Sequence, residues 1–358
     1  MLSALQDDLL LKLASQYGTP LYVYHAEKIT EQYRRLKEAF SDSDVTFFYA
    51  AKALTNIHVL EHVLETGCNI DCSSINEVHL ARKAGFPSGR ILYTSSNIHF
   101  SEIREAQSMG VHINIDSISN LRKFGEEYAS SYPVGIRLRP NIMAGGNIKI
   151  ATGHEASKFG IPLEDLPEVI NVMQETGLMI RSLHIHTGSE IKDVAVFCQG
   201  MELLFGLVRH FPDLQVLDLG GGFKVPYKPG ETGTDIPLLA SAIARSKNAF
   251  EAESGRHLQL WFEPGKFMVS ECGHFIVQVS VLKTSGKITF AGVDSGFNHL
   301  IRPMLYGAYH AIHNISRPGG EMKNYHVVGN ICETDTFAEG RDIAEIREGD
   351  LLAIRNAG

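Results

Sequence analysis

Polar side chains that can do chemistry stand at the ends of a series of short apolar runs. They comprise an amine, carboxylates, a guanidinium, a histidine, hydroxyls and glycines: Lys52, Asp71, Ser73, Arg139, His186, Ser189, Gly220–Gly222 and Glu263. If the runs are parallel strands of a barrel, these side chains gather at one face, where barrel enzymes bind their substrates. The pattern therefore indicates an enzyme.

Lys52 follows the apolar run Val45–Ala50 by two residues. An amine held at the end of an apolar strand is suited to act as a nucleophile toward a carbonyl compound. The alternative interpretation is a surface lysine whose aliphatic stem lies along apolar surface.

Two histidines, His184 and His186, close another run, and strand alternation sends both to the same face. One interpretation is that both histidines bind a metal ion. Another is that one imidazole ring stacks on a flat ligand, beside an anion site at Gly188-Ser189. A metal needs further ligands, and no set of Asp, Glu and His at matching strand ends is evident beyond Asp71 and Asp294. A buried, hydrogen-bonded histidine is the third interpretation.

The glycine triplet Gly220–Gly222 directly follows an apolar run, so its backbone N–H groups can close on a phosphate. A turn that needs positive φ is the simpler alternative, and no dinucleotide-binding GxGxxG spacing is present. Glu263 emerges from an apolar run and must meet a cation or a donor. Beside a pyridine nitrogen it would keep that nitrogen protonated, as pyridoxal chemistry requires.

Cys332 opens the segment Cys332-Glu333-Thr334-Asp335 in the last part of the chain. A thiol there can donate a proton, or it is a small buried apolar side chain.

The elements that must position these residues are eight apolar runs separated by stretches of helical spacing. The runs are Val45–Ala50, Cys68–Cys72, Arg90–Thr94, Val111–Asp116, Val134–Arg139, Arg181–Thr187, Val216–Gly220 and Leu258–Glu263. The helical stretches include Asn56–Glu65, Ile75–Ala84, Ser101–Met109 and Leu163–Glu175. Strands that are apolar on both faces and alternate with helices predict an α/β fold with a buried parallel sheet. Eight units favour a (β/α)8 TIM-type barrel over an open, doubly wound sheet.

From His274 onward the chain predicts strands without long helices, and hence a C-terminal β-rich domain. The strands are Phe275–Val281, Lys287–Val293, Tyr325–Gly329 and Leu351–Ile354. Pro20–Tyr24 is expected to join them, which predicts an N-terminal segment 1–24, a barrel 25–270 and a β-domain 271–358. The chain ends at Gly358 just after a strand, which we expect to be an uncapped edge, with the natural polypeptide continuing.

Composition excludes several classes of function. The chain has 358 residues, and 33 basic against 41 acidic side chains give a formal charge of −8, so it lacks the basic surface of a nucleic-acid binder. No apolar run reaches the 18 or more residues that span a bilayer, and residues 1–8 do not form a secretory signal. Five cysteines, an odd number, argue against a disulfide framework and predict a cytoplasmic location.

Nine motifs in sequence order carry a family resemblance. They are Tyr49-Ala50-Ala51-Lys52-Ala53, Asp71-Cys72-Ser73-Ser74 with Glu77, Ser157–Ile161, His184–Ser189, Gly220–Phe223, Glu263–Lys266, Asp294–Asn298, Arg302–Ala308 and Cys332–Asp335. With them, the chain resembles the fold-type III, pyridoxal 5'-phosphate-dependent amino-acid decarboxylases from Tyr17 onward. The resemblance implies an alanine racemase-like fold, which is a barrel plus a β-domain.

The resemblance also implies a role for each site residue. Lys52 is similar to the lysine that binds the cofactor covalently, and His186 to the histidine that stacks on its ring. The expected cofactor contacts are Asp71, Ser189, Gly220, Gly221, Gly222, Pro264, Gly265 and Lys266, with Glu263 at the ring nitrogen. The expected substrate contacts are Lys266, Arg302, Tyr306 and Glu333, and the expected catalytic residues are Lys52, His186 and Cys332.

Cys332 matches a proton donor that the partner subunit supplies in this family, which implies a head-to-tail homodimer with shared active sites. The small amino-acid substrate is expected to carry a distal carboxylate, because Arg302 offers it a cation. Position 266 is lysine where the family usually has arginine. Arginine can bind a phosphate or carboxylate through two parallel hydrogen bonds, whereas the lysine ammonium acts as a single point charge. Relatives also carry a Gly-Ala-Tyr-Gly segment, which would begin where this chain ends.

Other activities stay open beside this one. Sister decarboxylases act on carboxynorspermidine, ornithine or arginine, and a relative that binds the cofactor without catalysis would lack Cys332 or the substrate residues. A racemase of the same barrel type and a metal hydrolase built on His184 and His186 are the remaining alternatives.

Overall fold

The computed structural model describes residues 5–142 and 157–358 and divides into two compact units. The barrel unit comprises Gln32–Val225 and Thr232–Met268. The β-unit comprises the described residues up to Glu31, the short segment Pro226–Glu231, and Val269–Gly358. The domain limits expected from the sequence, at 24/25 and 270/271, stay a prediction.

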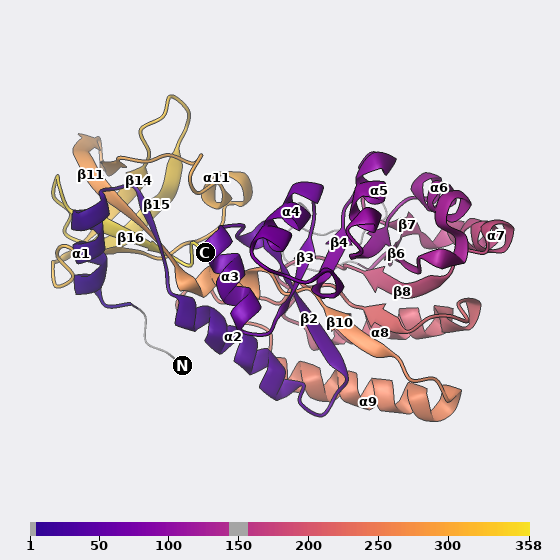
Figure 1. Cartoon of the computed structure of the whole chain (residues 1–358). Coiled ribbons are helices and arrows are strands. Elements are labelled where there is room, and N and C mark those ends of the chain that lie inside the picture. The colour runs from indigo at the N-terminus through magenta and orange to yellow at the C-terminus, as the bar shows by residue number, and fades with distance from the viewer. Residues whose placement is uncertain (1–4, 143–156) are drawn as a thin grey trace. The chain divides into compact units, whose positions relative to one another are not determined.

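The barrel unit is built on eight parallel strands, in agreement with the eight predicted runs. These strands are β2 (Val45–Ala50), β3 (Asn69–Cys72), β4 (Ile91–Thr94), β5 (His112–Ile115), β6 (Val134–Arg139), β8 (Ile180–Ile185), β9 (Val216–Asp218) and β10 (Gln259–Phe262). Each pairs with the next, and β10 returns to pair with β2, as Leu260 opposite Val45 shows. The sheet is therefore closed, and the predicted barrel is confirmed over the open sheet (Figure 1).

Helices surround the strands, which explains why the strands are apolar on both faces. The helices are α2 (Ala26–Ala39), α3 (Ile57–Glu65), α4 (Ile75–Lys83), α5 (Phe100–Ser108), α6 (Ile118–Tyr128), α7 (Leu166–Thr176), α8 (Val194–Leu207) and α9 (Ile236–Ser254). All four residues of β4 are buried, since one face meets the barrel interior and the other the helices. A two-residue strand, β7 (Ile161–Pro162), pairs in parallel with the last two residues of β6, Leu138 and Arg139.

Local capping places the strand-to-helix turns that carry the polar residues. The hydroxyl of Ser74 accepts a hydrogen bond from the Glu77 N–H at 3.2 Å. The Glu77 carboxylate accepts one from the Ser73 N–H at 2.6 Å. This reciprocal cap starts α4 directly after β3 and fixes the turn that holds Asp71 and Ser73.

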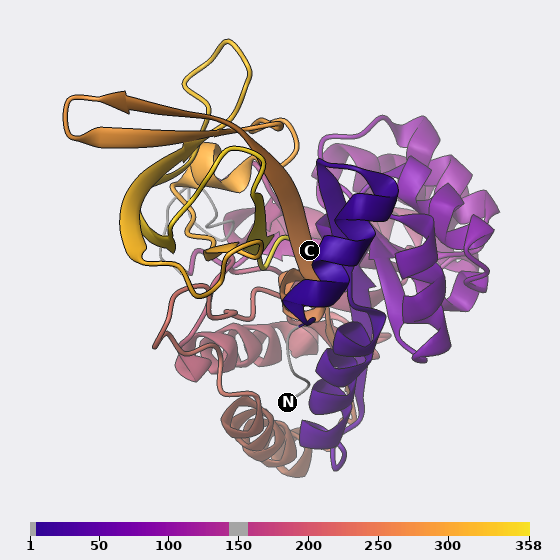
Figure 2. The same cartoon turned by 90° about the vertical axis from the view of Figure 1, so that its left-hand side faces the viewer.

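The β-unit contains seven strands and two short helices wholly within it. They are β1 (Leu21–Tyr24), β11 (Gly273–Ser285), β12 (Ile288–Val293), β13 (Ile312–Asn314), β14 (Met322–Val328), β15 (Thr336–Ala344), β16 (Leu351–Arg355), α1 (Asp7–Tyr17) and α11 (Arg302–Tyr306). The strand order is β13-β16-β11-β12-β14-β15, with β1 antiparallel to β11. Helix α10 (Lys266–Val269) lies where the chain passes between the units. Strands β11 and β12 are antiparallel and form a long hairpin (Figure 2).

Two expectations about the β-unit need correction. The last strand is not an edge, because β16 lies between β13 and β11, with Leu352 opposite both Asn314 and Val277. Strands β13 and β15 were not predicted from the sequence. The middle of β15 is exposed and charged and contains Gly340 at φ 57°, which conceals the apolar alternation of a strand.

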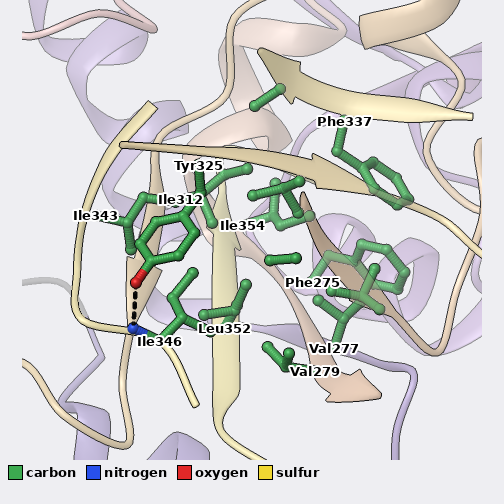
Figure 3. Close-up of a cluster of buried hydrophobic side chains, with 14 of the residues drawn as sticks. Phe275, Val277, Val279, Ile312, Tyr325, Phe337, Ile343, Ile346, Leu352 and Ile354 are labelled. Carbon is green, nitrogen blue, oxygen red and sulfur yellow. Dashed lines mark hydrogen bonds between the residues drawn. The ribbon is translucent and has the colours of Figure 1, made fainter. Parts of the chain in front are cut away.

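The core of the β-unit is one cluster of buried apolar side chains (Figure 3). Phe275, Tyr325, Leu352 and Ile354 are all less than 5% exposed. The Tyr325 hydroxyl accepts a hydrogen bond from the Ile346 N–H at 3.0 Å, so its polar end is satisfied inside the core. Burying each such side chain contributes roughly 1.5–3 kcal/mol.

Among the described residues, no helix is long and apolar enough to cross a membrane. All five cysteines are free thiols, and Cys332 is exposed.

Candidate active site

The barrel brings its predicted site residues together at the carboxyl ends of the strands. Lys52 lies in a turn of 3-10 helix at Ala51–Ala53, directly after β2. Its ammonium acts electrostatically on Asp71, His186 and Glu263, which come from three other strands. The barrel face expected from the sequence is therefore assembled.

Glu263 is a buried carboxylate of this face, and it is 5% exposed. Its Oε2 lies 3.4 Å from His184 Nε2, and its Oε1 lies 3.4 Å from the Thr94 hydroxyl. Burial raises the pKa of Glu263, but His184 and the Lys52 ammonium more than offset this, and the pKa lies well below its usual range. Glu263 is therefore a buried carboxylate that stays charged, which suits a protonated ring nitrogen.

Asp71, at the end of β3, is fully buried. Burial, followed by the charge of Glu263, raises the pKa of Asp71 well above its usual value, although Lys52 opposes the shift. Within the described part of the chain, neither Asp71 oxygen nor the Ser73 hydroxyl has a hydrogen-bond partner. Unpaired buried polar groups are costly, so these groups are suited to contact a polar ligand.

His186 is held by the backbone of the glycine run. Its Nδ1 accepts a hydrogen bond from the Gly221 N–H at 3.2 Å, which places the proton of the neutral ring on Nε2. Burial, followed by the charges of Lys52 and Arg137, lowers the pKa of His186 well below its usual value. The ring is therefore neutral and fixed in orientation, as a stacking residue requires.

One interpretation of the sequence was that His184 and His186 bind a metal together. Among the described residues, the group whose atoms could hold a metal ion contains His184 but not His186. His184 lies with Asp218 and Glu263, and one ligand atom from each lies within 4.8 Å of the others. Asp294 belongs to the β-unit, where its carboxylate accepts hydrogen bonds from Thr19 at 2.5 Å and from the Gln278 N–H at 2.8 Å. The carboxylate nearest to His184 is thus Glu263.

The run Gly220–Gly222 needs glycine for reasons of space as well as conformation. A Cβ at Gly221 would collide with the backbone carbonyl of Glu263, and one at Gly222 with that of Gly188. Gly220 and Gly222 have φ values of 66° and 98°, which side chains rarely adopt. The glycines therefore let three strand ends approach closely enough for backbone N–H groups to face one ligand.

The segment Glu263–Lys266 passes close to the strand that precedes Lys52. The Ala50 N–H donates to the Pro264 carbonyl at 3.1 Å, and a Cβ at Gly265 would lie 3.3 Å from the Ala50 Cβ. Lys266 begins α10 and pairs with Glu190, the residue that follows Ser189.

Arg302 and Tyr306 belong to the β-unit and form the two ends of α11. The Arg302 guanidinium lies over the Tyr227 ring at 4.5 Å, and its Nη1 is 3.2 Å from His310 Nε2. These contacts fix the guanidinium in place.

Cys332 and Glu333 are exposed in the loop between β14 and β15. Asp335, two residues after Glu333, is 4% exposed and anchors this loop. Its Oδ1 accepts a hydrogen bond from the Phe297 N–H at 2.7 Å, and its backbone carbonyl accepts one from the Gly329 N–H at 2.7 Å. The motifs Asp294–Asn298 and Cys332–Asp335 are thus parts of one structure that presents the thiol.

Several site residues escaped the sequence analysis: Thr94, Asn114, Arg137, Asp218 and Glu190. Arg137 and Asp218 stand inside apolar runs, and a charged residue in a buried strand is a signal that could have found them. Glu190 carries no comparable signal, because its φ of 62° and its contact with Lys266 appear only in the fold.

These residues fit pyridoxal phosphate. An amine, a charged buried carboxylate, a neutral fixed imidazole and a glycine run match the aldehyde, ring nitrogen, ring face and phosphate of that cofactor. The unpaired Asp71 and Ser73 add polar groups that a ligand can satisfy.

Comparison with known proteins agrees with this chemistry. Residues 26–270 match the family model described as pyridoxal-dependent decarboxylase, pyridoxal binding domain. The chain is 39% identical to a diaminopimelate decarboxylase of Methanothermobacter thermautotrophicus over 97% of this chain and 83% of that protein. It is 34% identical to one of Pseudomonas fluorescens, over 97% and 84%. Among solved structures, diaminopimelate decarboxylase from Helicobacter pylori complexed with L-lysine matches with a TM-score of 0.88 and 30% identity, over 98% of this chain and 88% of that one.

Proposed function

Because the chain belongs to the family of pyridoxal-dependent decarboxylases, we propose that it converts meso-2,6-diaminopimelate to L-lysine and CO2. This is the last step of lysine biosynthesis. The relatives named diaminopimelate decarboxylase match over nearly the whole chain, and one solved relative is complexed with L-lysine, the product of this reaction. The observation that carries the proposal is the charged, buried Glu263 among Lys52, Asp71 and His186.

When bound, pyridoxal phosphate supplies a ring that withdraws the electron pair left behind by departing CO2. Lys52 would hold the cofactor covalently through its amine. Glu263 would keep a proton on the ring nitrogen, and His186 would stack on the ring. Ser189, Gly220–Gly222 and the segment Pro264–Lys266 would bind the phosphate, and Asp71 would supply a further polar contact.

Substrate recognition rests on the β-unit residues. Arg302 offers a cation to the distal carboxylate, held by Tyr227 and His310. With Arg302, Tyr306 and Glu333 would bind the distal amino-carboxylate end of the substrate, and Lys266 would contact a carboxylate. A substrate without a distal carboxylate would offer no group of opposite charge to Arg302, which disfavours ornithine.

Protonation completes the reaction at the carbon that lost CO2. The Cys332 thiol donates that proton, since it is exposed on an anchored loop. We propose that the thiol and Glu333 come from the partner subunit of a homodimer, so that each active site combines two copies of the chain.

CO2 release from the purified protein with pyridoxal phosphate tests the proposal on separate samples of meso-diaminopimelate, carboxynorspermidine, ornithine and arginine. Turnover of diaminopimelate alone is the expected result. Turnover of one of the other three would keep the cofactor and overturn the role of Arg302. Cofactor binding without turnover of any of them would favour a racemase or a non-catalytic relative.

A further inference from the structure

Asp218 is a fully buried carboxyl group for which the proposed mechanism has no use. It ends β9, two residues before Gly220, the first glycine of the run. Its Oδ1 accepts a hydrogen bond from the Gly220 N–H at 2.9 Å. Its Oδ2 is buried and has no hydrogen-bond partner of ordinary geometry in residues 5–142 and 157–358. A buried carboxyl oxygen in this state needs an explanation.

The side chains of Glu263 and His184 lie close to Asp218. An oxygen of Asp218, an oxygen of Glu263 and a ring nitrogen of His184 all lie within 4.8 Å of one another. All three residues are at most 5% exposed. Two carboxylates this close in a water-poor site repel each other, which favours the neutral form of one of them.

The hydrogen-bond donors of the barrel interior identify Glu263 as the charged member. Ser182 Oγ donates to Asn114 Oδ1 at 3.3 Å, and Asn114 Nδ2 donates to Thr94 Oγ1 at 3.1 Å. The Thr94 hydroxyl proton is then free to point at Glu263 Oε1, 3.4 Å away. A chain of donors that ends on one carboxylate stabilises its charge.

The fold makes room for this chain of donors. A Cβ at Gly135, in β6, would collide with both Asn114 Oδ1 and Ser182 Oγ. Glycine at this position is therefore required by the polar chain, since no turn or positive φ demands it there.

We propose that Asp218 is a positioning residue for the cofactor: as a neutral acid, it donates a hydrogen bond to Glu263 and fixes that carboxylate for the ring nitrogen. Its other oxygen holds Gly220, the first residue of the phosphate-binding run. One side chain thus sets the two contacts at opposite ends of the cofactor. This inference rests on the proposed function and adds a residue to it.

The charges around Asp218 agree with this assignment. Burial, followed by the charge of Glu263, raises the pKa of Asp218 well above its usual value. Asp71 acts in the same direction. Burial lowers the pKa of the nearby Arg137, and Glu263 is the charge that opposes this shift most strongly.

The test compares two replacements of Asp218 in the full-length protein. Asp218→Asn keeps a neutral donor and an acceptor of the same shape, whereas Asp218→Leu removes both. Asp213→Asn, at an exposed position five residues earlier, is the matched control. The readouts are the dissociation constant for pyridoxal phosphate and the visible absorbance of the bound cofactor between pH 6 and 9.

We expect Asp218→Asn and the control to bind pyridoxal phosphate within about threefold of the parent protein, with an unchanged pH profile of absorbance. Asp218→Leu should weaken binding by about 10- to 100-fold, the usual effect of losing a hydrogen bond to a charged group. If Asp218→Asn is as damaging as Asp218→Leu, Asp218 acts as a charged group and the inference is wrong. Unchanged binding by Asp218→Leu would overturn it as well.

Two further measurements keep the test decisive. If Asp218→Leu does not fold, Thr94→Val replaces it in the test, because it removes the other donor to Glu263. Thr94→Val should weaken cofactor binding by several-fold. Unchanged cofactor binding by Thr94→Val, together with weakened binding by Asp218→Asn, would refute the inference. Stoichiometric zinc in the purified parent protein, lost in Asp218→Asn, would show that His184, Asp218 and Glu263 bind a metal instead. A parent protein that binds no pyridoxal phosphate would refute the proposed function itself, whatever the variants do.

Discussion

Lys266 Nζ lies 3.0 Å from Glu190 Oε1, although the two residues are 76 positions apart in the chain. Both side chains are about one-quarter exposed, and Glu190 holds an unusual φ of 62° directly after Ser189. Lysine occupies a position where the family usually has arginine, and here its charge is shared with a carboxylate. Glu190 therefore partly neutralises the positive charge of Lys266.

Glu190→Gln should make Lys266 more available to anions. We expect inorganic phosphate to inhibit this variant about two- to fivefold more strongly than the parent protein, in line with the modest strength of exposed ion pairs. Glu126→Gln, at an exposed position in α6, is the control and should leave inhibition unchanged. Weaker phosphate inhibition in Glu190→Gln would show that the pair orders Lys266 for binding.

Lys52→Ala should abolish the visible absorbance of covalently attached cofactor, because Lys52 is the amine that we assign to the covalent link. Turnover should fall by a factor on the order of a thousand or more, as is common when a covalent catalytic residue is removed. Lys123→Ala, at an exposed position in α6, serves as control. Retention of the absorbance band by Lys52→Ala would assign the covalent link to another residue.

Cys332→Ala should keep the cofactor absorbance and lose turnover by about 10²- to 10⁴-fold, the usual contribution of a general acid. Cys198→Ala changes a partly buried thiol in α8 and should remain active. Full activity of Cys332→Ala removes the thiol from the mechanism.

Mixing the two inactive variants tests the shared site. If the thiol crosses a dimer interface, random re-association of Lys52→Ala with Cys332→Ala restores about a quarter of the active sites. If each chain supplies its own thiol, no activity returns.

Asp335→Ala should loosen the loop that carries Cys332. The substitution leaves the partly buried Phe297 N–H without its acceptor, which costs about 1–3 kcal/mol in the free energy of unfolding. Turnover should fall while cofactor absorbance is retained. The exposed Asp342→Ala, which only loses a hydrogen bond from Asn324, should change stability by less than about 0.5 kcal/mol. Equal effects of the two variants would count against an anchoring role.

His310 should make the protein less stable as the pH falls from about 6.5 toward 4. Its Nδ1–H donates to the Arg355 carbonyl at 3.0 Å, so its Nε2 is the acceptor for Arg302. Burial and, among the neighbouring charges, Arg302 lower the pKa of His310 to about 4, from an ordinary value near 6.5. The unfolded chain binds the proton more readily, and stability present above pH 6.5 is lost as the pH falls through this window, by about 3 kcal/mol at most.

Melting temperatures measured from pH 7 to 4 check this effect. His310→Gln should show a smaller drop over the range than the parent protein, whereas the exposed His58→Gln should show the same drop. His274, whose pKa burial and Arg355 also lower to about 4, accounts for part of the remaining slope. An identical slope in His310→Gln would mean that His310 does not titrate in this range.

The barrel, its eight strands and the gathering of Lys52, Asp71 and Glu263 at one face were predictable from the sequence. Runs such as Val45–Ala50 and Ile91–Thr94 are apolar on both faces, and only a covered parallel sheet explains several of them in series. Parallel strands place their carboxyl ends at one face, so the strand-end positions of Lys52, Asp71 and Glu263 already implied a common site.

Only the tertiary structure decided the contacts between segments that lie far apart in the chain. The burial of Asp218 beside Glu263 and His184, the ion pair of Glu190 with Lys266, and the anchoring of the thiol loop by Asp335 each join separate segments. Sequence periodicity reports which face of an element is apolar, but not which polar groups meet across the core. Protonation states follow from burial and from those neighbours, so the charge on Glu263 and the neutrality of Asp218 are properties of the fold.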